Sequence, residues 1–318
     1  MVDGVSKNIE VILHSDSNNN YITTTAIGEP YSSDFKRYSM PSWKSYCKKY
    51  GLGLAIVTKE LISTDDKYYK KVNWQKFLVG TELKTLDILV NNICHLDTDI
   101  LISPIAPNIF DFHHDDKISV ISLRKNLPFS YGDALKKIAY FRNKYYDHKY
   151  PLDSALFISV NDLYSHHNLN VPKIADETCS GVYVYNSNKY SDFFENFFYS
   201  YTQDIDTITN GGDQTHFNYH VLNRDVNFLS YKFQAIWVFE LATKYSFLYD
   251  NPTSGMIKKC IEATLLDNYF LHFAGAWHES NMWKIDDILN KENAITFQNF
   301  YQYSTQEVSG APIGMIKP

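Results

Sequence analysis

Two aspartates, Asp97 and Asp99, interrupt an otherwise apolar segment at residues 93–102. Residues two apart in an extended segment point to the same side, so both carboxylates face one place. Ionised carboxylates in an apolar strand are costly unless they pair with cations or bind a metal. Two of them can share a hard divalent cation, which would neutralise a diphosphate on its other face. The alternative is an acidic turn or a helix cap, but the apolar residues on both sides favour a metal site.

A histidine far along the chain is a candidate third ligand. His272 lies in the apolar segment 269–273 and is followed by Ala274 and Gly275. Mixed carboxylate and imidazole ligation suits Mn²⁺ better than Mg²⁺, so we expect Mn²⁺, with Mg²⁺ as the alternative cofactor. Taken alone, however, His272 fits better as a core histidine with both ring nitrogens hydrogen-bonded.

Three more side chains could contact a bound ligand. Asp213 and Gln214 follow a pair of glycines, which permit close backbone approach, and they begin a predicted helix. They either face the hydroxyls of a sugar or only start the helix, with Asp213 as its cap. Taken alone, the cap is the better explanation. Lys76 could reach a phosphate from its own helix, although a lone lysine on a helix is usually solvated.

Composition and cysteine usage exclude several classes of protein. The chain has 318 residues, 44% of them apolar, and a net charge of -6, which argues against nucleic-acid binding by phosphate neutralisation. Its four cysteines are scattered, which fits free thiols in a reducing compartment better than a disulfide framework. No apolar run approaches the roughly 20 residues that span a bilayer, and residues 1–10 hold no apolar signal core. We therefore expect a soluble, cytoplasmic protein; the oligomeric state is not predicted.

Alternating strands and helices must position the candidate residues. Their order predicts an α/β fold with a Rossmann-like, mostly parallel central sheet flanked by helices. Ligands bind such sheets at the carboxyl ends of the strands, where Asp97 and Asp99 lie. No internal repeat or linker is evident, so we expect one domain at 1–305 and a loose tail at 306–318. The expected strands are 9–14, 21–26, 54–58, 88–96, 100–102, 118–123, 155–159, 181–186 and 269–273, and the expected helices are 32–50, 74–83, 133–146, 192–199 and 213–222.

Several segments, in their order along the chain, resemble the motifs of GT-A-fold, metal-dependent glycosyltransferases that use a nucleotide-sugar donor. Residues 96–102 match the family's Asp-x-Asp motif. Residues 272–275 resemble the late His-Phe-x-Gly segment of the glycogenin-like and galactosyl- or mannosyltransferase-like branches. The other similar segments are 21–28 (first strand and nucleobase loop), 41–51 (next helix), 74–77 (helix before the metal motif), 180–182 (Ser-Gly-Val strand) and 212–214 (Gly-Asp-Gln helix start).

This resemblance implies roles for the residues of the reaction centre. Asp99 and His272 would bind the metal directly, whereas Asp97 would contact the ribose and assist at the metal. Asp213 and Gln214 would be the catalytic residues that face the transferred sugar near its anomeric carbon.

The resemblance also implies which residues hold the donor. Lys76 would face it from the helix before the metal motif. Family members often place a diphosphate-binding lysine shortly after the His-Phe-x-Gly segment, but this chain has none there. Either His278 or Lys284 would take that role, or the metal alone would stabilise the leaving group. The nucleoside pocket would be lined by Thr24, Ala26 and Gly28.

The expected function is transfer of a sugar from a nucleotide-diphosphate donor to a hydroxyl of a glycan or other acceptor. UDP-sugars are favoured, with GDP-sugars as the alternative, and retention of configuration is favoured because no extra carboxylate base stands out. Residues 1–112 would form the donor-binding half and residues 113–305 the acceptor side. Two other functions stay open, a nucleotidyltransferase on a related α/β fold and a non-catalytic carbohydrate-binding protein with a decayed transferase site.

Overall fold

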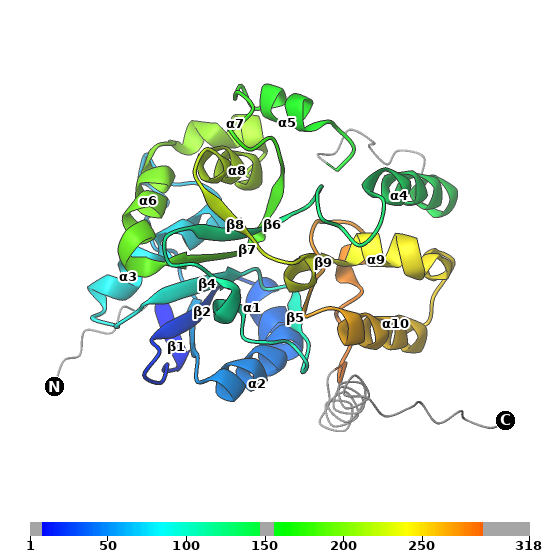
Figure 1. Cartoon of the computed structure of the whole chain (residues 1–318), viewed down its shortest axis with the longest axis horizontal. Helices are drawn as coiled ribbons and strands as arrows, with labels where there is room; N and C mark the ends of the chain where they lie inside the picture. Colours follow the sequence, from blue (N-terminus) through cyan, green and yellow to red (C-terminus); the bar gives the residue numbers. More distant parts are fainter. Residues whose placement is uncertain (1–7, 147–155, 289–318) are drawn as a thin grey trace, which may run out of the picture.

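A seven-stranded sheet forms the centre of the structure, a computed structural model that describes residues 8–146 and 156–288. Its strand order is β1-β3-β2-β4-β7-β6-β8 (Figure 1). Strands β3, β2, β4, β6 and β8 run in one direction, and β1 and β7 run against them. The predicted α/β class with a mostly parallel sheet is therefore confirmed. The strands are β1 (Ile9–Leu13), β2 (Asn20–Thr25), β3 (Gly53–Val57), β4 (Asn92–Leu96), β6 (Ile118–Ser122), β7 (Thr178–Asn186) and β8 (Val226–Phe228).

Both faces of this sheet are buried, because alternate residues of its strands enter two separate cores. Tyr183 and Tyr185 of β7 pack into a core rich in aromatic side chains on one face. Val182 and Val184 of the same strand pack into a second core on the opposite face. The first face is covered by α3 (Val79–Thr85), α6 (Ser187–Tyr199) and α8 (Gln214–Leu222), and the second by α2 (Met40–Tyr50).

The two helices predicted before the aspartates are present, each with an irregular first part. At 32–50, α1 (Tyr31–Asp34) passes through a π-helical turn at 35–39 into α2. Gly51 ends α2 with φ +63°, a conformation in which glycine carries no Cβ penalty. At 74–83, a 3₁₀ helix (Val72–Leu78) continues as α3.

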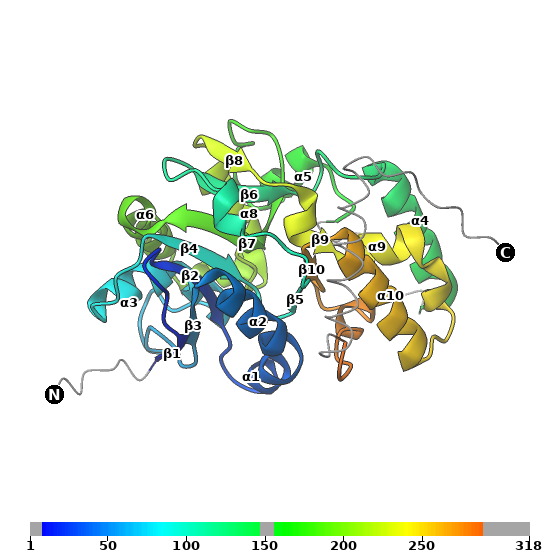
Figure 2. The same cartoon turned by 60° about the horizontal axis from the view of Figure 1, so that its bottom comes forward.

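A second, three-stranded sheet lies beyond the ends of the central strands β4 and β7 (Figure 2), and its strand β10 (Phe270–His272) ends with His272. In its register His272 lies opposite Ile100, the residue that follows Asp99. Strand pairing therefore brings residue 272 beside the two aspartates. The order is β5 (Ile100–Ile102), β10 (Phe270–His272) and β9 (Ala235–Ile236), and the surrounding helices are α4 (Tyr131–Tyr145), α9 (Trp237–Lys244) and α10 (Ser254–Asp267).

The strand predicted at 155–159 is wrong. Residue 155 lies outside the described residues, and residues 156–159 lead into α5 (Val160–His166). The Ser159 hydroxyl accepts a hydrogen bond from the Asp162 N–H and so caps α5, which makes this residue a helix start. The tail predicted at 306–318 also lies outside the described residues. In the described part of the chain, no helix is long and apolar enough to cross a membrane.

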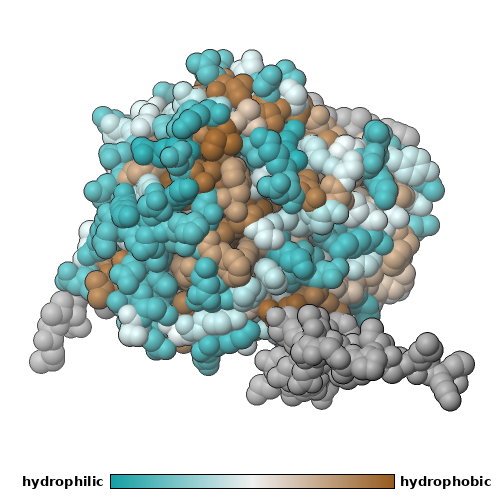
Figure 3. All heavy atoms as spheres, in the orientation of Figure 1, coloured by the Kyte–Doolittle hydropathy of each residue, from teal (hydrophilic) through white to brown (hydrophobic). Residues whose placement is uncertain are grey.

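Polar residues dominate the face of the molecule shown in Figure 3, with a hydrophobic band through its middle. Large hydrophobic residues that are exposed come from many different elements of the described chain, for example Tyr31, Leu89, Tyr140 and Phe247. Scattered exposure of this kind is normal for a folded domain. These exposed residues therefore indicate no functional site, which has to be sought among the buried polar side chains.

Candidate active site

The structure brings the three predicted metal ligands together. Asp97 and Asp99 lie between β4 and β5, and His272 ends β10. One ligand atom from each residue lies within 4.8 Å of the others. His272 Nε2 is 3.2 Å from Asp99 Oδ1 and 3.9 Å from Asp97 Oδ2. Two carboxylate oxygens and an imidazole nitrogen form a donor set that fits Mn²⁺.

Backbone pairing holds this cluster from two sides. The Asp97 N–H donates to the Gly181 carbonyl at 2.9 Å, and the Phe273 N–H donates to the Asp99 carbonyl at 3.1 Å. Gly181 also leaves the space that the ligands need. A Cβ at this position would lie 2.8 Å from Asp97 Oδ2 and closer still to His272 Cε1. The bare backbone of β7 therefore permits Asp97 and His272 to pack against it.

Lys76 is buried beside the aspartates and is not solvated on its helix. Its Nζ lies 2.8 Å from Asp213 Oδ2 and 3.6 Å from Asp97 Oδ1. It also donates to the carbonyl and the hydroxyl of Ser180, each at 3.1 Å. Burial lowers the pKa of Lys76, but Asp213 and Asp97 raise it more, so the net shift is upward. Lys76 is therefore a charged link between the two carboxylates.

His95 is a second partner of Asp97. Its Nε2 lies 3.3 Å from Asp97 Oδ1, and its ring stacks on Tyr183. Burial lowers the pKa of His95 more than the contact with Asp97 raises it, which favours a neutral ring. Burial raises the pKa of Asp97, but Lys76 and His95 lower it more, to well below its usual range. Asp97 is therefore an anionic oxygen donor.

The electrostatic surroundings of His272 favour positive charge at the cluster. Burial lowers the pKa of His272, but Asp99 and then Cys179 raise it more, and it lies well above its usual value. A ring in this position attracts either a proton or a metal ion. Because a metal ligand must be deprotonated, the two compete for the same nitrogen.

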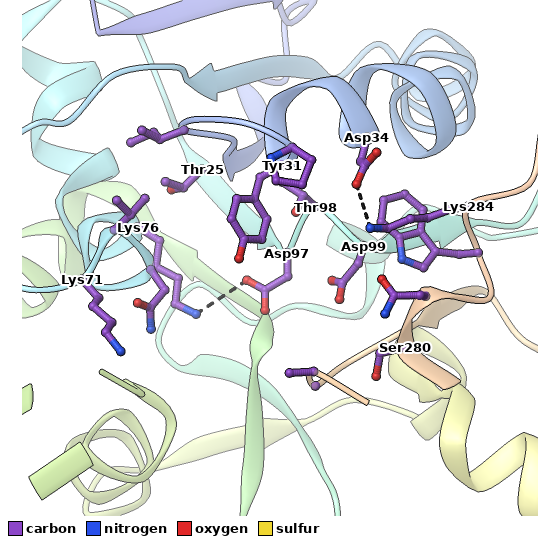
Figure 4. A pocket seen from close by; sticks show the side chains of 18 of the residues that line it. Thr25, Tyr31, Asp34, Lys71, Lys76, Asp97, Thr98, Asp99, Ser280 and Lys284 are labelled. Carbon is purple, nitrogen blue, oxygen red and sulfur yellow. Dashed lines mark ion pairs between the residues drawn. The ribbon is translucent and has the colours of Figure 1, made fainter. Parts of the chain in front are cut away.

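A cleft of about 730 Å³ opens over the aspartates. Figure 4 shows Asp97 and Asp99 at its floor, Tyr31 above them, and Lys76 directed at Asp97. Lys71 lies on the other side of Lys76 in the same view. The full lining is Thr25, Ile27, Pro30, Tyr31, Asp34, Lys71, Val72, Asn73, Lys76, His95, Asp97, Thr98, Asp99, Gly275, Ala276, Ser280, Asn281, Trp283 and Lys284.

The three residues expected to line a nucleoside pocket, Thr24, Ala26 and Gly28, are not among those that line this cleft. Thr25 and Ile27 line the cleft, whereas Thr24 and Ala26 are buried in the protein core. Successive residues of an extended segment face opposite sides, so a shift by one residue exchanges the side chains that face the cleft with those that face the core. Gly28 has φ +76° and lies outside the cleft lining, with open space where a Cβ would be.

Lys284 and His278 were alternatives for binding the diphosphate, and the structure places them in different surroundings. Lys284 lines the cleft, where its Nζ lies 2.9 Å from Asp34 Oδ2. His278 is exposed outside both described cavities, and its ring lies 4.8 Å from that of Tyr146. Lys284 is therefore the residue of the two that could contact a phosphate in the cleft.

Asp213 and Gln214 point to different places. Asp213 accepts a hydrogen bond from Asn73 and forms an ion pair with Lys76, two residues that line the cleft. Gln214 lines a second cavity of about 240 Å³ and donates from Nε2 to Glu177 Oε1 at 2.8 Å. The second cavity meets the first at Gly275. Its lining is Leu123, Tyr131, Arg142, Leu156, Glu177, Cys179, Gln214, Ile236, Val238, Phe239, Ala274, Gly275 and Trp277.

Several cleft residues were not predicted from the sequence. His95 could have been found, because it lies two residues before Asp97 at the end of the same strand. Tyr31 and Lys71 had no comparable signal, since they come from a short helix and from a loop before a 3₁₀ helix.

Comparisons with known proteins add little to this geometry. No protein-family model matches the chain, and no curated protein matches it in sequence. One solved structure that is similar in fold is described as the "crystal structure of a glycosyltransferase involved in the glycosylation of the major capsid of PBCV-1". The similarity covers 83% of this chain and 99% of that chain, with 9% sequence identity and a TM-score of 0.43. Likeness at this level carries no argument about function, which has to be inferred from the site itself.

Proposed function

We propose that this protein is a metal-dependent glycosyltransferase that moves a sugar from a nucleotide-diphosphate donor to a hydroxyl of a glycan or other acceptor. The observation that carries the proposal is that Asp97 and Asp99 line a cleft of about 730 Å³ and meet the buried His272 there. That volume lies in the usual range for small-molecule and cofactor sites. UDP-sugars are the favoured donors, as the resemblance of the sequence motifs implies.

In this proposal the cluster holds Mn²⁺, which supplies Lewis-acid stabilisation of the leaving diphosphate when it is bound. The protein contributes fixed positive charge around the same point. Lys76 keeps Asp97 ionised from behind, while Lys71 and Lys284 face the cleft and could bind phosphate oxygens. Tyr31, above the aspartates in Figure 4, offers an aromatic face for the nucleoside.

The second cavity supports a place for the sugar that reacts. Gln214 and Glu177 supply polar atoms there, and Trp277 supplies an aromatic wall. Glu177 is the one carboxylate among the described residues of that lining. Its oxygens already accept hydrogen bonds from Arg124 and Gln214, which suits a positioning role better than that of a general base. This arrangement favours a retaining reaction.

The test is donor hydrolysis and transfer with a panel of UDP- and GDP-sugars, in Mn²⁺ and in EDTA. Wild-type protein should act on at least one donor in Mn²⁺ and lose activity in EDTA, and Asp99→Ala should be inactive. Asp225→Ala is the matched control. It removes an exposed carboxylate whose ion-pair partner, Lys173, is also exposed. Full activity in EDTA or in Asp99→Ala would contradict the metal role.

A further inference from the structure

A buried amide lies directly behind the histidine of the cluster. Gln234 is fully buried at the end of a 3₁₀ helix (Tyr231–Gln234), just before β9. Its Nε2 lies 3.2 Å from His272 Nδ1 and 3.4 Å from the Cys179 carbonyl oxygen. Its Oε1 is buried with no hydrogen-bond partner among the described residues. An orphaned amide oxygen of this kind is costly and calls for an explanation.

The chemistry of a histidine ligand can explain why this amide lies beside His272. A metal on His272 Nε2 uses the lone pair of that nitrogen, so the ring proton has to reside on Nδ1. An Nδ1–H group buried beside the metal needs an acceptor, and metal-bound histidines usually have a carbonyl or carboxylate there. Cys179 Sγ, at 3.7 Å from Nδ1, is a weak acceptor. The Gln234 amide is the stronger candidate in contact.

We infer that Gln234 is a positioning residue whose amide oxygen accepts the Nδ1–H of His272 and so fixes the ring tautomer that leaves Nε2 for the metal. The two ends of an amide are nearly equal in size, so a half-turn exchanges Oε1 and Nε2 with little movement of the neighbours. The half-turn gives the orphaned oxygen a partner. In exchange it gives up the 3.4 Å contact with the Cys179 carbonyl and turns the amide NH₂ to the buried position where Oε1 has no partner. This inference rests on the proposed metal site and deepens it.

Strand pairing explains why this amide can control the ligand. The residues that follow Gln234 form β9, which pairs in parallel with β10, and Ile236 lies beside His272 in that register. The amide and the imidazole are therefore carried by adjacent strands of one small sheet. The pairing of the two strands therefore fixes the separation between the amide and the imidazole.

The test compares Mn²⁺ binding, without nucleotide, in wild-type protein and in Gln234→Met and Gln234→Glu. Free Mn²⁺ is counted by electron paramagnetic resonance, and calorimetry gives the Kd. Gln234→Met keeps the length of the side chain but removes the acceptor, so its Kd should rise about ten- to hundredfold. Gln234→Glu keeps an acceptor oxygen and should bind Mn²⁺ no more weakly than wild type. Gln75→Met, which changes another fully buried amide, should leave the Kd unchanged.

The outcomes separate this inference from the function on which it rests. Wild-type protein that binds no Mn²⁺ overturns the metal site itself. Wild-type binding with an unchanged Kd in Gln234→Met overturns only the role of Gln234. Equal weakening in Gln234→Met and Gln234→Glu also overturns it, because a purely structural amide would be lost in both. If Gln234→Met does not fold, Gln234→Glu against wild type decides, since weakened binding there contradicts an acceptor role.

Discussion

Substitution of Gly181 by alanine tests whether the cluster depends on the bare backbone of β7. The added Cβ would lie 2.8 Å from Asp97 Oδ2 and closer still to His272 Cε1, well inside ordinary contact distance. The backbone of Gly181 is not in the left-handed region, so the cost is steric and falls on the two ligands. Overpacking of this kind costs about 1–3 kcal/mol. Because both ligands must move, Mn²⁺ affinity should fall by at least about tenfold, the scale seen when the supports of a ligand are removed.

The assay pairs the Mn²⁺ Kd, from calorimetry, with the free energy of unfolding, from urea denaturation. Gly132→Ala is the matched control, because no atom lies within 4 Å of a Cβ built there. It should leave the Kd unchanged and alter stability by no more than about 1 kcal/mol. A Gly181→Ala protein that folds and binds Mn²⁺ like wild type would refute the reasoning, since the ligands would then have no need of this space.

Two further predictions concern stability. Lys76→Met leaves the carboxylates of Asp213 and Asp97 without their buried partner, so it should lower the free energy of unfolding by about 3–5 kcal/mol in urea denaturation. Burial lowers the pKa of His216 and His220 from 6.5 to about 4, so the unfolded chain takes up protons first as the pH falls. Stability should therefore decline between pH 6.5 and 4, and His216→Phe should reduce that decline in urea titrations at pH 7 and 5.

The meeting of Asp97, Asp99 and His272 could be predicted from the sequence because most of its signals are local and directional. Two aspartates at the end of an apolar strand point to one side, and ligand sites in α/β sheets lie at such strand ends. His272 required the order of motifs along the chain as well, since a lone histidine in an apolar strand is usually part of the core. The structure explains its position by the pairing of β10 with β5.

The walls of the site were harder to predict, for physical reasons. Thr24 and Ala26 were expected to line a nucleoside pocket, but they are buried, and their neighbours Thr25 and Ile27 line this cleft. From the sequence, Lys76 was indistinguishable from an ordinary solvated lysine, because the partners that allow its charge to be buried lie far away in the sequence. Gln234 gave no signal at all, since its role depends on a contact between two short strands.

The central claim is that Asp97, Asp99 and His272 together bind a divalent metal. Its most direct test is the binding of Mn²⁺ to wild-type protein and to His272→Ala, with circular dichroism to follow the fold. We expect one Mn²⁺ per wild-type chain, and binding at least tenfold weaker in a His272→Ala protein that remains folded. A His272→Ala protein that binds Mn²⁺ with the wild-type Kd, or unfolds with its metal affinity intact, would contradict the claim and make His272 a core residue.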